Sequence, residues 1–351
     1  MHNLLAAKSP SGYERNATKV FNDYMYVVNG ARFEFEDNAN NAAWSVGAEN
    51  PLKVIMLSGH IDEIALQVQN IDDKGFIHFI KDGGIDPKTI LGSTVTILTN
   101  NGEVKGVIGK QPIHIEWRNK DAKDKATEIK DMKIDVGAES KEEVLEMGIN
   151  IGDPITINDI PLELGKYRFS SRGLDDKIGV YITAEVLRRL GEVGLHSVKV
   201  VGVACTQEEV SATGATIAAK RINPDISIDY DVTFATDDEY VSPNEWGDIK
   251  LGKGGAIAYG PDNHKELTQL VKSVCTHKGI PYQEFSVGSG ATDTVHIKKS
   301  SSNAATMLLS IPNRNMHTQV EVCDYRDIES LIDMTVETIL AIDKNNGLIN
   351  K

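Results

Sequence analysis

The chain repeatedly alternates short apolar runs with longer segments in which apolar residues recur every three or four positions. Four apolar runs are bounded by turn residues, at residues 54–57, 198–205, 226–228 and 304–311. Such runs are typical of strands buried on both faces of a parallel sheet. Helical periodicity occurs at residues 13–25, 177–190, 213–221, 264–278 and 325–344. The order predicts an α/β fold with a mainly parallel sheet flanked by helices.

The first of these helices is preceded by a capping motif. Ser11 and Glu14 have the S-x-x-E spacing of a capping box. In such a box, each of the two side chains accepts a hydrogen bond from the backbone N–H of the other residue. The motif predicts that a helix opens close to Tyr13.

Residues from about 67 to 160 follow a different pattern. Short alternating runs separated by Asp-Gly and Asn-Gly turns occur at residues 76–80, 94–98, 104–108, 132–136 and 154–157. This pattern is typical of a small all-β barrel or sandwich. Because the α/β pattern precedes and follows it, we expect an α/β domain of residues 1–66 and 161–351, with a β domain of residues 67–160 inserted in it. The charged stretch 118–130 is expected to be an exposed loop or short helix.

Charge and hydropathy exclude several kinds of partner. The 351 residues include 37 Lys and Arg against 51 Asp and Glu, a net charge of −14. A field of this sign repels phosphate backbones and anionic lipids, so neither nucleic acid nor a membrane is expected to bind. The longest apolar run, residues 198–205, is far shorter than the ~20 residues that cross a bilayer. With no visible secretory signal and three widely spaced cysteines, we expect a cytoplasmic protein without disulfides.

Polar side chains that bind metals follow the predicted strands. In an open α/β sheet, ligands bind at the carboxyl ends of the strands. The candidates at this edge are His60, Asp62, Glu208, Glu209, Asp231 and His317, together with Asp175 and Asp176 at a helix start. Imidazoles and carboxylates without cysteine favour zinc, cobalt or manganese.

The spacing of these residues predicts different roles for neighbouring side chains. His60 and Asp62 are two positions apart, so on an extended strand they share a face, and Asp62 can orient the imidazole. Glu208 and Glu209 are adjacent and on an extended backbone point to different sides. One of them can then bind a metal while the other acts as general base for a metal-bound water.

Each motif taken alone also has a structural explanation. A histidine at a strand end is often only hydrogen-bonded, and Asp175 and Asp176 are favourable charges at a helix N-terminus. Glu208 and Glu209 can be solvated loop residues, and Asp231 has other aspartates nearby as competitors. The occurrence of all these residues at consecutive strand ends is what favours a metal site.

Taken in order along the chain, the motifs resemble those of the dinuclear-metal aminopeptidases of the tetrahedral (TET) type. This family includes glutamyl and deblocking aminopeptidases, and some members carry cellulase or endoglucanase labels. The matching segments are residues 59–64, 173–179, 206–210, 231–233, 290–293 and 312–317. The resemblance covers nearly the whole chain, including the inserted β domain.

The resemblance implies two divalent metal ions per subunit, with zinc or cobalt favoured. The implied ligands are His60, Asp175, Glu209, Asp231 and His317, with Asp175 bridging the ions. Glu208 is implied as the general base that takes a proton from the bridging water and gives it to the leaving amine, and Asp62 as the residue that orients His60. Two ions about 3.5–4 Å apart can hold the water and polarise the scissile carbonyl. Such a site removes the first residue from short peptides with a free amino terminus.

The resemblance also implies a large homo-oligomer. In the family the inserted β domain mediates dimerisation, and dimers assemble into a hollow tetrahedral dodecamer. Some positions depart from the family pattern: Lys177 stands where arginine is common, Ala65 where glycine is frequent, and Asn315 where an aromatic residue is often found. None of them removes a ligand, but Asn315 means that substrate preference cannot be copied from a relative.

Two other classes of protein are compatible with part of the pattern. A glycosidase needs two carboxyl groups about 5–9.5 Å apart that flank one bond, with no metal, and would leave the two histidines unexplained. A non-catalytic scaffold of the same fold would usually lack a ligand or the base, whereas all seven residues are present.

Overall fold

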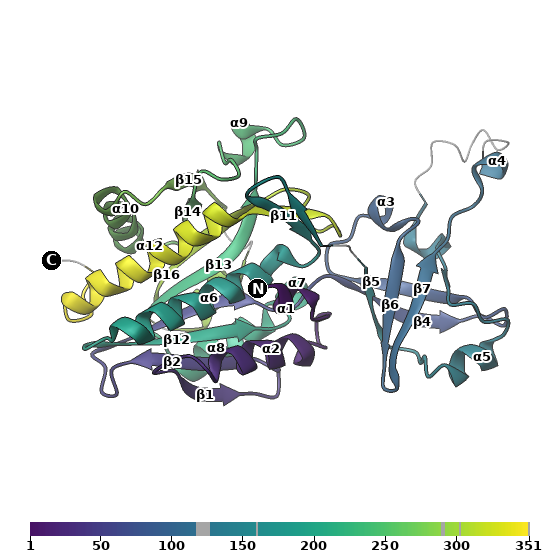
Figure 1. Cartoon of the computed structure of the whole chain (residues 1–351), viewed down its shortest axis with the longest axis horizontal. Coiled ribbons are helices and arrows are strands. Elements are labelled where there is room, and N and C mark those ends of the chain that lie inside the picture. Colours follow the sequence, from purple (N-terminus) through teal and green to yellow (C-terminus); the bar gives the residue numbers. More distant parts are fainter. Residues whose placement is uncertain (117–126, 159–160, 289–291, 302, 350–351) are drawn as a thin grey trace.

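A computed structural model describes the chain apart from residues 117–126, 159–160, 289–291, 302 and 350–351. It has an α/β domain from which a closed β-barrel projects (Figure 1). The predicted fold class is therefore confirmed. No helix in the described part of the chain is long and apolar enough to span a membrane.

Eight strands form the sheet of the α/β domain. In spatial order they are β1 (Arg32–Glu36), β2 (Ala42–Gly47), β12 (Val198–Cys205), β3 (Lys53–His60), β13 (Ile226–Phe234), β16 (Ala305–Asn313), β14 (Gly255–Tyr259) and β15 (Tyr282–Ser286). The central strands β12, β3, β13 and β16 are parallel, as predicted. The sheet as a whole is mixed, because β2 pairs antiparallel with both β1 and β12, and β14 pairs antiparallel with β16.

Helices cover both faces of this sheet. They are α1 (His2–Ala6), α2 (Arg15–Met25), α6 (Leu174–Val193), α8 (Thr213–Ile222), α10 (Lys265–Lys278), α11 (Asp293–Ser300) and α12 (Tyr325–Lys344). Successive residues of a strand face opposite sides. On β3, Ile55 and Leu57 therefore join the core beneath α6 and α12, whereas Met56 packs in the core beneath α8 and α11.

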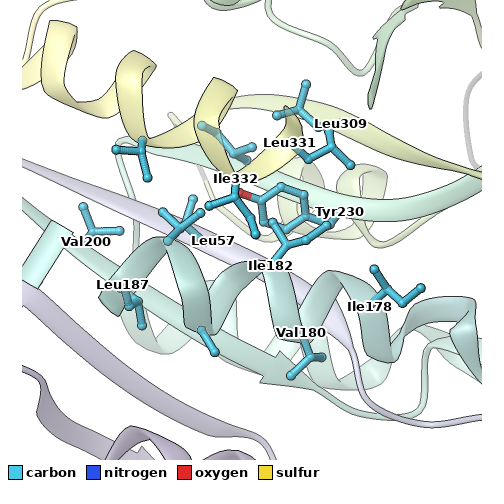
Figure 2. Close-up of a cluster of buried hydrophobic side chains, with 14 of the residues drawn as sticks. Leu57, Ile178, Val180, Ile182, Leu187, Val200, Tyr230, Leu309, Leu331 and Ile332 are labelled. Atoms are coloured by element: carbon cyan, nitrogen blue, oxygen red, sulfur yellow. The ribbon is translucent and has the colours of Figure 1, made fainter. Parts of the chain in front are cut away.

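The larger core lies between the sheet, α6 and α12 (Figure 2). Tyr230 of β13 points into it beside Ile182 and Ile332 and is 1% exposed. Its hydroxyl donates to Thr335 Oγ1 at 2.8 Å, because a buried hydroxyl without a partner would be costly. This core holds β13 rigidly, and the residues at the carboxyl end of β13 are held with it.

The barrel is closed by six strands, in the order β4-β5-β8-β7-β6-β9. Their bounds are β4 (Ala65–Ile71), β5 (Ile77–Asp82), β8 (Ile134–Asp135), β7 (Gly102–Ile108), β6 (Thr94–Thr99) and β9 (Pro154–Ile157). Short helices α3 (Pro87–Ile90), α4 (Ile113–Glu116) and α5 (Lys141–Glu146) and a 3-10 turn (Ile129–Asp131) connect them. The barrel has its own apolar core. Much of the predicted charged loop, residues 117–126, lies outside the described residues.

A small second sheet joins distant parts of the α/β domain. It consists of β10 (Leu162–Leu164), β11 (Arg168–Ser171) and β17 (Glu321–Asp324). Two one-turn helices complete the fold, α7 (Glu208–Ser211) after β12 and α9 (Pro243–Trp246) after β13. The small sheet brings β17 close to the start of α6, where Asp175 lies.

The predicted capping box of the first helix does not form. Helix α2 begins at Arg15, with Glu14 as an N-cap that makes no side-chain cap. Ser11 instead donates its hydroxyl to Asp62 at 2.5 Å, and Glu14 accepts from the backbone N–H of Gly12 at 2.6 Å. The physical reason is the burial of Asp62, since a carboxyl group removed from water needs hydrogen-bond partners, and Ser11 supplies one.

A buried ion cluster lies where the chain leaves β3 for the barrel. Glu63 accepts hydrogen bonds from Arg172 and from Lys177, the latter at 3.0 Å. The backbone N–H of Ser9 donates to the same carboxylate at 2.8 Å. Burial alone would raise the pKa of Glu63, but the two cations lower it to about 2. The cluster therefore connects the segment that follows β3 with the start of α6.

We expect Glu63→Gln to lower the free energy of unfolding by about 3–5 kcal/mol, because the substitution removes the negative charge from between two buried cations. Urea unfolding measures this difference. The control is Glu192→Gln, which breaks an exposed pair with Arg188 and should cost less than ~1 kcal/mol. Since the folded pKa of Glu63 is depressed, its contribution is present above the ordinary value of 4.5 and is lost as the pH falls toward 2. Equal losses for both variants at neutral pH would contradict the expectation.

Candidate metal centre

The predicted ligands come from five elements and meet at the carboxyl end of the central strands. His60 ends β3, Asp231 lies near the end of β13 and Asp175 opens α6. Glu208 and Glu209 begin α7, and His317 follows β16. One common cavity is lined by five of the candidate residues, Asp175, Glu208, Glu209, Asp231 and His317.

Asp175 lies between two imidazoles. Its Oδ1 is 3.0 Å from Nε2 of His60, and its Oδ2 is 3.3 Å from Nε2 of His317. Nε2 of His317 is also 3.5 Å from a carboxylate oxygen of Glu209. Although burial acts in the opposite direction, hydrogen bonds with His317 and His60 hold the pKa of Asp175 well below its ordinary range. Each oxygen of this carboxylate therefore faces a different nitrogen donor.

The other carboxylates of the cavity are crowded together. Burial raises the pKa of Glu208 to about 7, and the neighbouring Asp175 and Asp62 act in the same direction against the imidazole of His60. The pKa of Glu209 and of Asp231 is also raised, first by burial and next by Asp175. So much buried negative charge is unfavourable unless a cation balances it.

The donor set suits such a cation. His60, Asp175 and Glu209 each offer a ligand atom, and the three atoms lie within 4.8 Å of one another. Imidazole nitrogen with carboxylate oxygen is a donor combination that zinc, cobalt and manganese accept. The residues present therefore fit a divalent metal.

Asp62 connects the histidine to the two glutamates. Its side chain accepts hydrogen bonds from the backbone N–H of Glu208 at 3.0 Å and of Glu209 at 3.2 Å. Nδ1 of His60 lies 3.5 Å from Asp62 Oδ1 and 3.2 Å from the main-chain carbonyl of the same residue. Asp62 thus contacts the imidazole and also holds the start of α7, a contact that the sequence did not indicate.

The prediction of an extended backbone at Glu208 and Glu209 is wrong. Gln207 has φ of +57°, and the two glutamates form the first residues of helix α7. The reason is Asp62, whose carboxylate accepts both of their N–H groups, a geometry typical of a helix start. Consecutive residues on a helix still point about 100° apart. Glu208 lies 3.9 Å from His60, and Glu209 lies next to His317.

Asp176 faces away from the cavity. It is joined to Asp175 by a cis peptide bond, is fully buried and accepts hydrogen bonds from the N–H groups of His60 and Gly179 at 3.2 and 3.1 Å. Of the motif at residues 290–293, Gly290 and Ala291 lie outside the described residues, whereas Thr292 lines the cavity.

Two residues near the ligands were not found from the sequence. Glu321 of β17 is buried and accepts hydrogen bonds from the N–H of His317 at 2.9 Å and of Asp175 at 3.2 Å. The main-chain carbonyl of Gly84, which follows β5 of the barrel, lies 2.9 Å from Nδ1 of His317. A Cβ at Gly84 would be 2.7 Å from that nitrogen. No local pattern signals either contact, because both depend on how distant segments pack.

Comparisons with known proteins identify the family of the chain. The family model of the M42 glutamyl aminopeptidases matches residues 40–334. A lysyl aminopeptidase of Pyrococcus furiosus is 36% identical over 288 residues, which are 80% of this chain and 79% of that protein.

Solved structures show the same fold over almost the whole chain. A TET aminopeptidase of the marine sediment archaeon Thaumarchaeota archaeon SCGC AB-539-E09 matches with a TM-score of 0.91 at 29% identity, covering 98% of this chain and 96% of that one. The Pyrococcus horikoshii TET1 peptidase, which can assemble into a tetrahedron or a large octahedral shell, matches with a TM-score of 0.85 at 29% identity, covering 96% and 97%. The chain therefore belongs to the M42 glutamyl aminopeptidase family.

Proposed function

We propose that this chain is a metal-dependent aminopeptidase that releases amino-terminal residues from short peptides. The observation that carries the proposal is Asp175, whose two oxygens face His60 and His317 at the edge of a cavity crowded with carboxylates. Membership of an aminopeptidase family supports the class of reaction.

Two divalent ions, zinc or cobalt, would be bound by five side chains. The proposed ligands are those of His60, Asp175, Glu209, Asp231 and His317. When bound, such ions would lower the pKa of a water molecule, so that it can lose a proton near neutral pH and act as the nucleophile, and they would polarise the scissile carbonyl.

Glu208 is the general base of the proposed reaction. It takes a proton from the attacking water and gives it to the leaving amine. Its position supports this role, since Glu208 lines the cavity beside the proposed ligands and its carboxylate lies 3.9 Å from Nε2 of His60. Asp62 is the positioning residue, because it contacts Nδ1 of His60 and holds the backbone of Glu208.

Self-association through the barrel, as a tetrahedral dodecamer, is part of the proposal. It is supported by the likeness to a TET1 peptidase that can assemble into a tetrahedron. Short peptides are the proposed substrates, and neither nucleic acid nor a membrane is a proposed partner. A cytoplasmic location is consistent with the three cysteines, each free and buried. No specific observation favours a glycosidase or a non-catalytic scaffold.

The proposal is tested by peptide hydrolysis under controlled metal content. We expect short peptides with a free amino terminus to be shortened one residue at a time, while acetylated peptides stay intact. Chelation should abolish cleavage, and added zinc or cobalt should restore it. Product release is followed by mass spectrometry. Absence of cleavage with every metal, or cleavage of acetylated peptides at the same rate, would refute the proposed activity.

Glu208→Gln is expected to lower kcat by about 10²–10⁴, because general base catalysis typically contributes that much. Metal content and oligomeric state should not change, since the substitution removes a charge and keeps the size of the side chain. The measurements are kcat on a short peptide, metal analysis and sedimentation. A near-normal kcat would exclude Glu208 as the base.

His317→Ala and Gly84→Ala are both expected to weaken metal retention. The first removes a proposed ligand, and the second places a Cβ 2.7 Å from Nδ1 of that ligand. Metal remaining after dialysis against a chelator is the measurement. The controls are His277→Ala on the exposed side of α10 and Gly109→Ala, a barrel glycine around which nothing lies within 4 Å. If each variant retains as much metal as its control, the assignment of His317 fails.

A further inference from the structure

We propose that the cavity beside the metal centre selects amino-terminal residues with large apolar or basic side chains and excludes acidic ones, with Glu245 pairing the cation of a basic residue. The proposal rests on the proposed function, because it names the substrates of the same site. It concerns the walls of the cavity and not the ligands.

The walls beyond the ligands are mainly apolar. The cavity has a volume of about 560 Å³, within the range of small-molecule sites. Its apolar lining includes Phe234, Trp246, Phe285, Val287, Leu308 and Met316. The ring of Phe234 meets Trp246 edge-on, with the two centroids 4.8 Å apart. Such walls favour a large apolar side chain, because burial of that side chain removes its apolar surface from water.

The ionisable side chains of the cavity lining are acidic, apart from His317. None of the described residues that line the cavity is lysine or arginine, and His317, the one lining residue able to carry a positive charge, belongs to the proposed ligand set. Beyond the ligands and Glu208, Glu245 is the only ionisable side chain among the described residues of the lining. A glutamyl or aspartyl side chain would therefore enter without a basic side chain of the lining to pair with and would meet the carboxylate of Glu245, which is unfavourable.

Glu245 is free to pair with a substrate cation. Within the described residues, no ion pair or side-chain hydrogen bond engages its carboxylate, whereas the nearby Asp248 is paired with Lys250 at 2.9 Å. The apolar stem of a lysyl or arginyl residue can lie along the aromatic wall, with its charged end at the exposed rim. Trp246 is 52% exposed there and presents a ring face that attracts cations.

A hydrogen bond connects the end of the helix that carries Glu245 with the segment that follows β13. Helix α9, which carries Glu245 and Trp246, ends at Gly247, whose carbonyl accepts a hydrogen bond from Thr236 Oγ1 at 2.8 Å. Thr236 lies two residues beyond β13, the strand that holds Asp231. This hydrogen bond therefore helps to fix the backbone that carries Glu245 relative to the proposed ligands.

The test compares kcat/KM for the p-nitroanilides of L-lysine, L-leucine and L-glutamate. We expect the glutamyl substrate to be cleaved at least about 30-fold more slowly than the other two, since its charge would lie beside Glu245 without a basic side chain of the lining to pair with. Glu245→Gln should lower the lysyl-to-leucyl ratio about two- to fivefold, the size of an exposed ion pair. Glu245→Lys should lower that ratio further and raise the glutamyl rate. Glu239→Gln, an exposed glutamate outside the cavity lining, should leave the ratio unchanged.

Binding of free L-lysine, L-leucine and L-glutamate, measured by calorimetry on the metal-loaded protein, separates this proposal from the proposed function. Hydrolysis with a lysyl-to-leucyl ratio that neither Glu245 variant changes would overturn the role of Glu245. A glutamyl rate equal to the lysyl rate would overturn the exclusion of acidic residues. If no substrate is hydrolysed but lysine binding still falls in Glu245→Gln, the selectivity stands and the aminopeptidase function fails.

Discussion

The contact of one buried carboxylate with two imidazoles is the interaction around which the site is arranged. Asp175 can face His60 and His317 only because strands β3 and β16 end, and helix α6 begins, at the same edge of the sheet. Its own backbone N–H and that of His317 are both bound by Glu321. The remaining carboxylates lie close together in the same cavity. The pKa of Glu209 and of Asp231 is raised by burial and by the charge of Asp175, and a bound cation would reduce the cost of ionising them.

The barrel takes part in this arrangement although its strands form a separate core. Gly84 supplies a carbonyl 2.9 Å from Nδ1 of His317, and a side chain at this position would collide with the ring. Ser93 of the barrel also hydrogen-bonds the side chain of Gln319, two residues beyond that histidine, at 3.2 Å. A domain proposed to mediate assembly is thus in direct contact with a proposed metal ligand, so its placement bears on the geometry of the site.

The proposed chemistry and the proposed selectivity depend on different parts of the cavity. The proposed ligands lie at the ends of the buried parallel strands, where the packing around Tyr230 holds the backbone in place. The walls that would meet a substrate side chain come partly from strand residues, Phe234, Phe285 and Leu308, and partly from two connecting segments, the short helix α9 and the residues after β15. Because these segments are short connections at the surface, their residues can change without disturbing the ligands.

The sequence by itself determined the elements and the candidate ligands. The strand at residues 198–205 and the helix at 325–344 have the bounds that were predicted, because periodicity within a segment reports directly which face is buried. The rule that ligands meet at the carboxyl ends of parallel strands was enough to select His60 and His317 as candidates, whereas Asp175 was distinguished from Asp176 only by the family resemblance. Only the tertiary structure decided the contacts of Glu321, Gly84 and Ser11, and the helical turn at Glu208. The contact of Ser11 joins two side chains 51 positions apart. The others depend on backbone N–H and carbonyl groups, which nearly every residue type carries, and on segments as far as 233 positions apart, so no local pattern marks them.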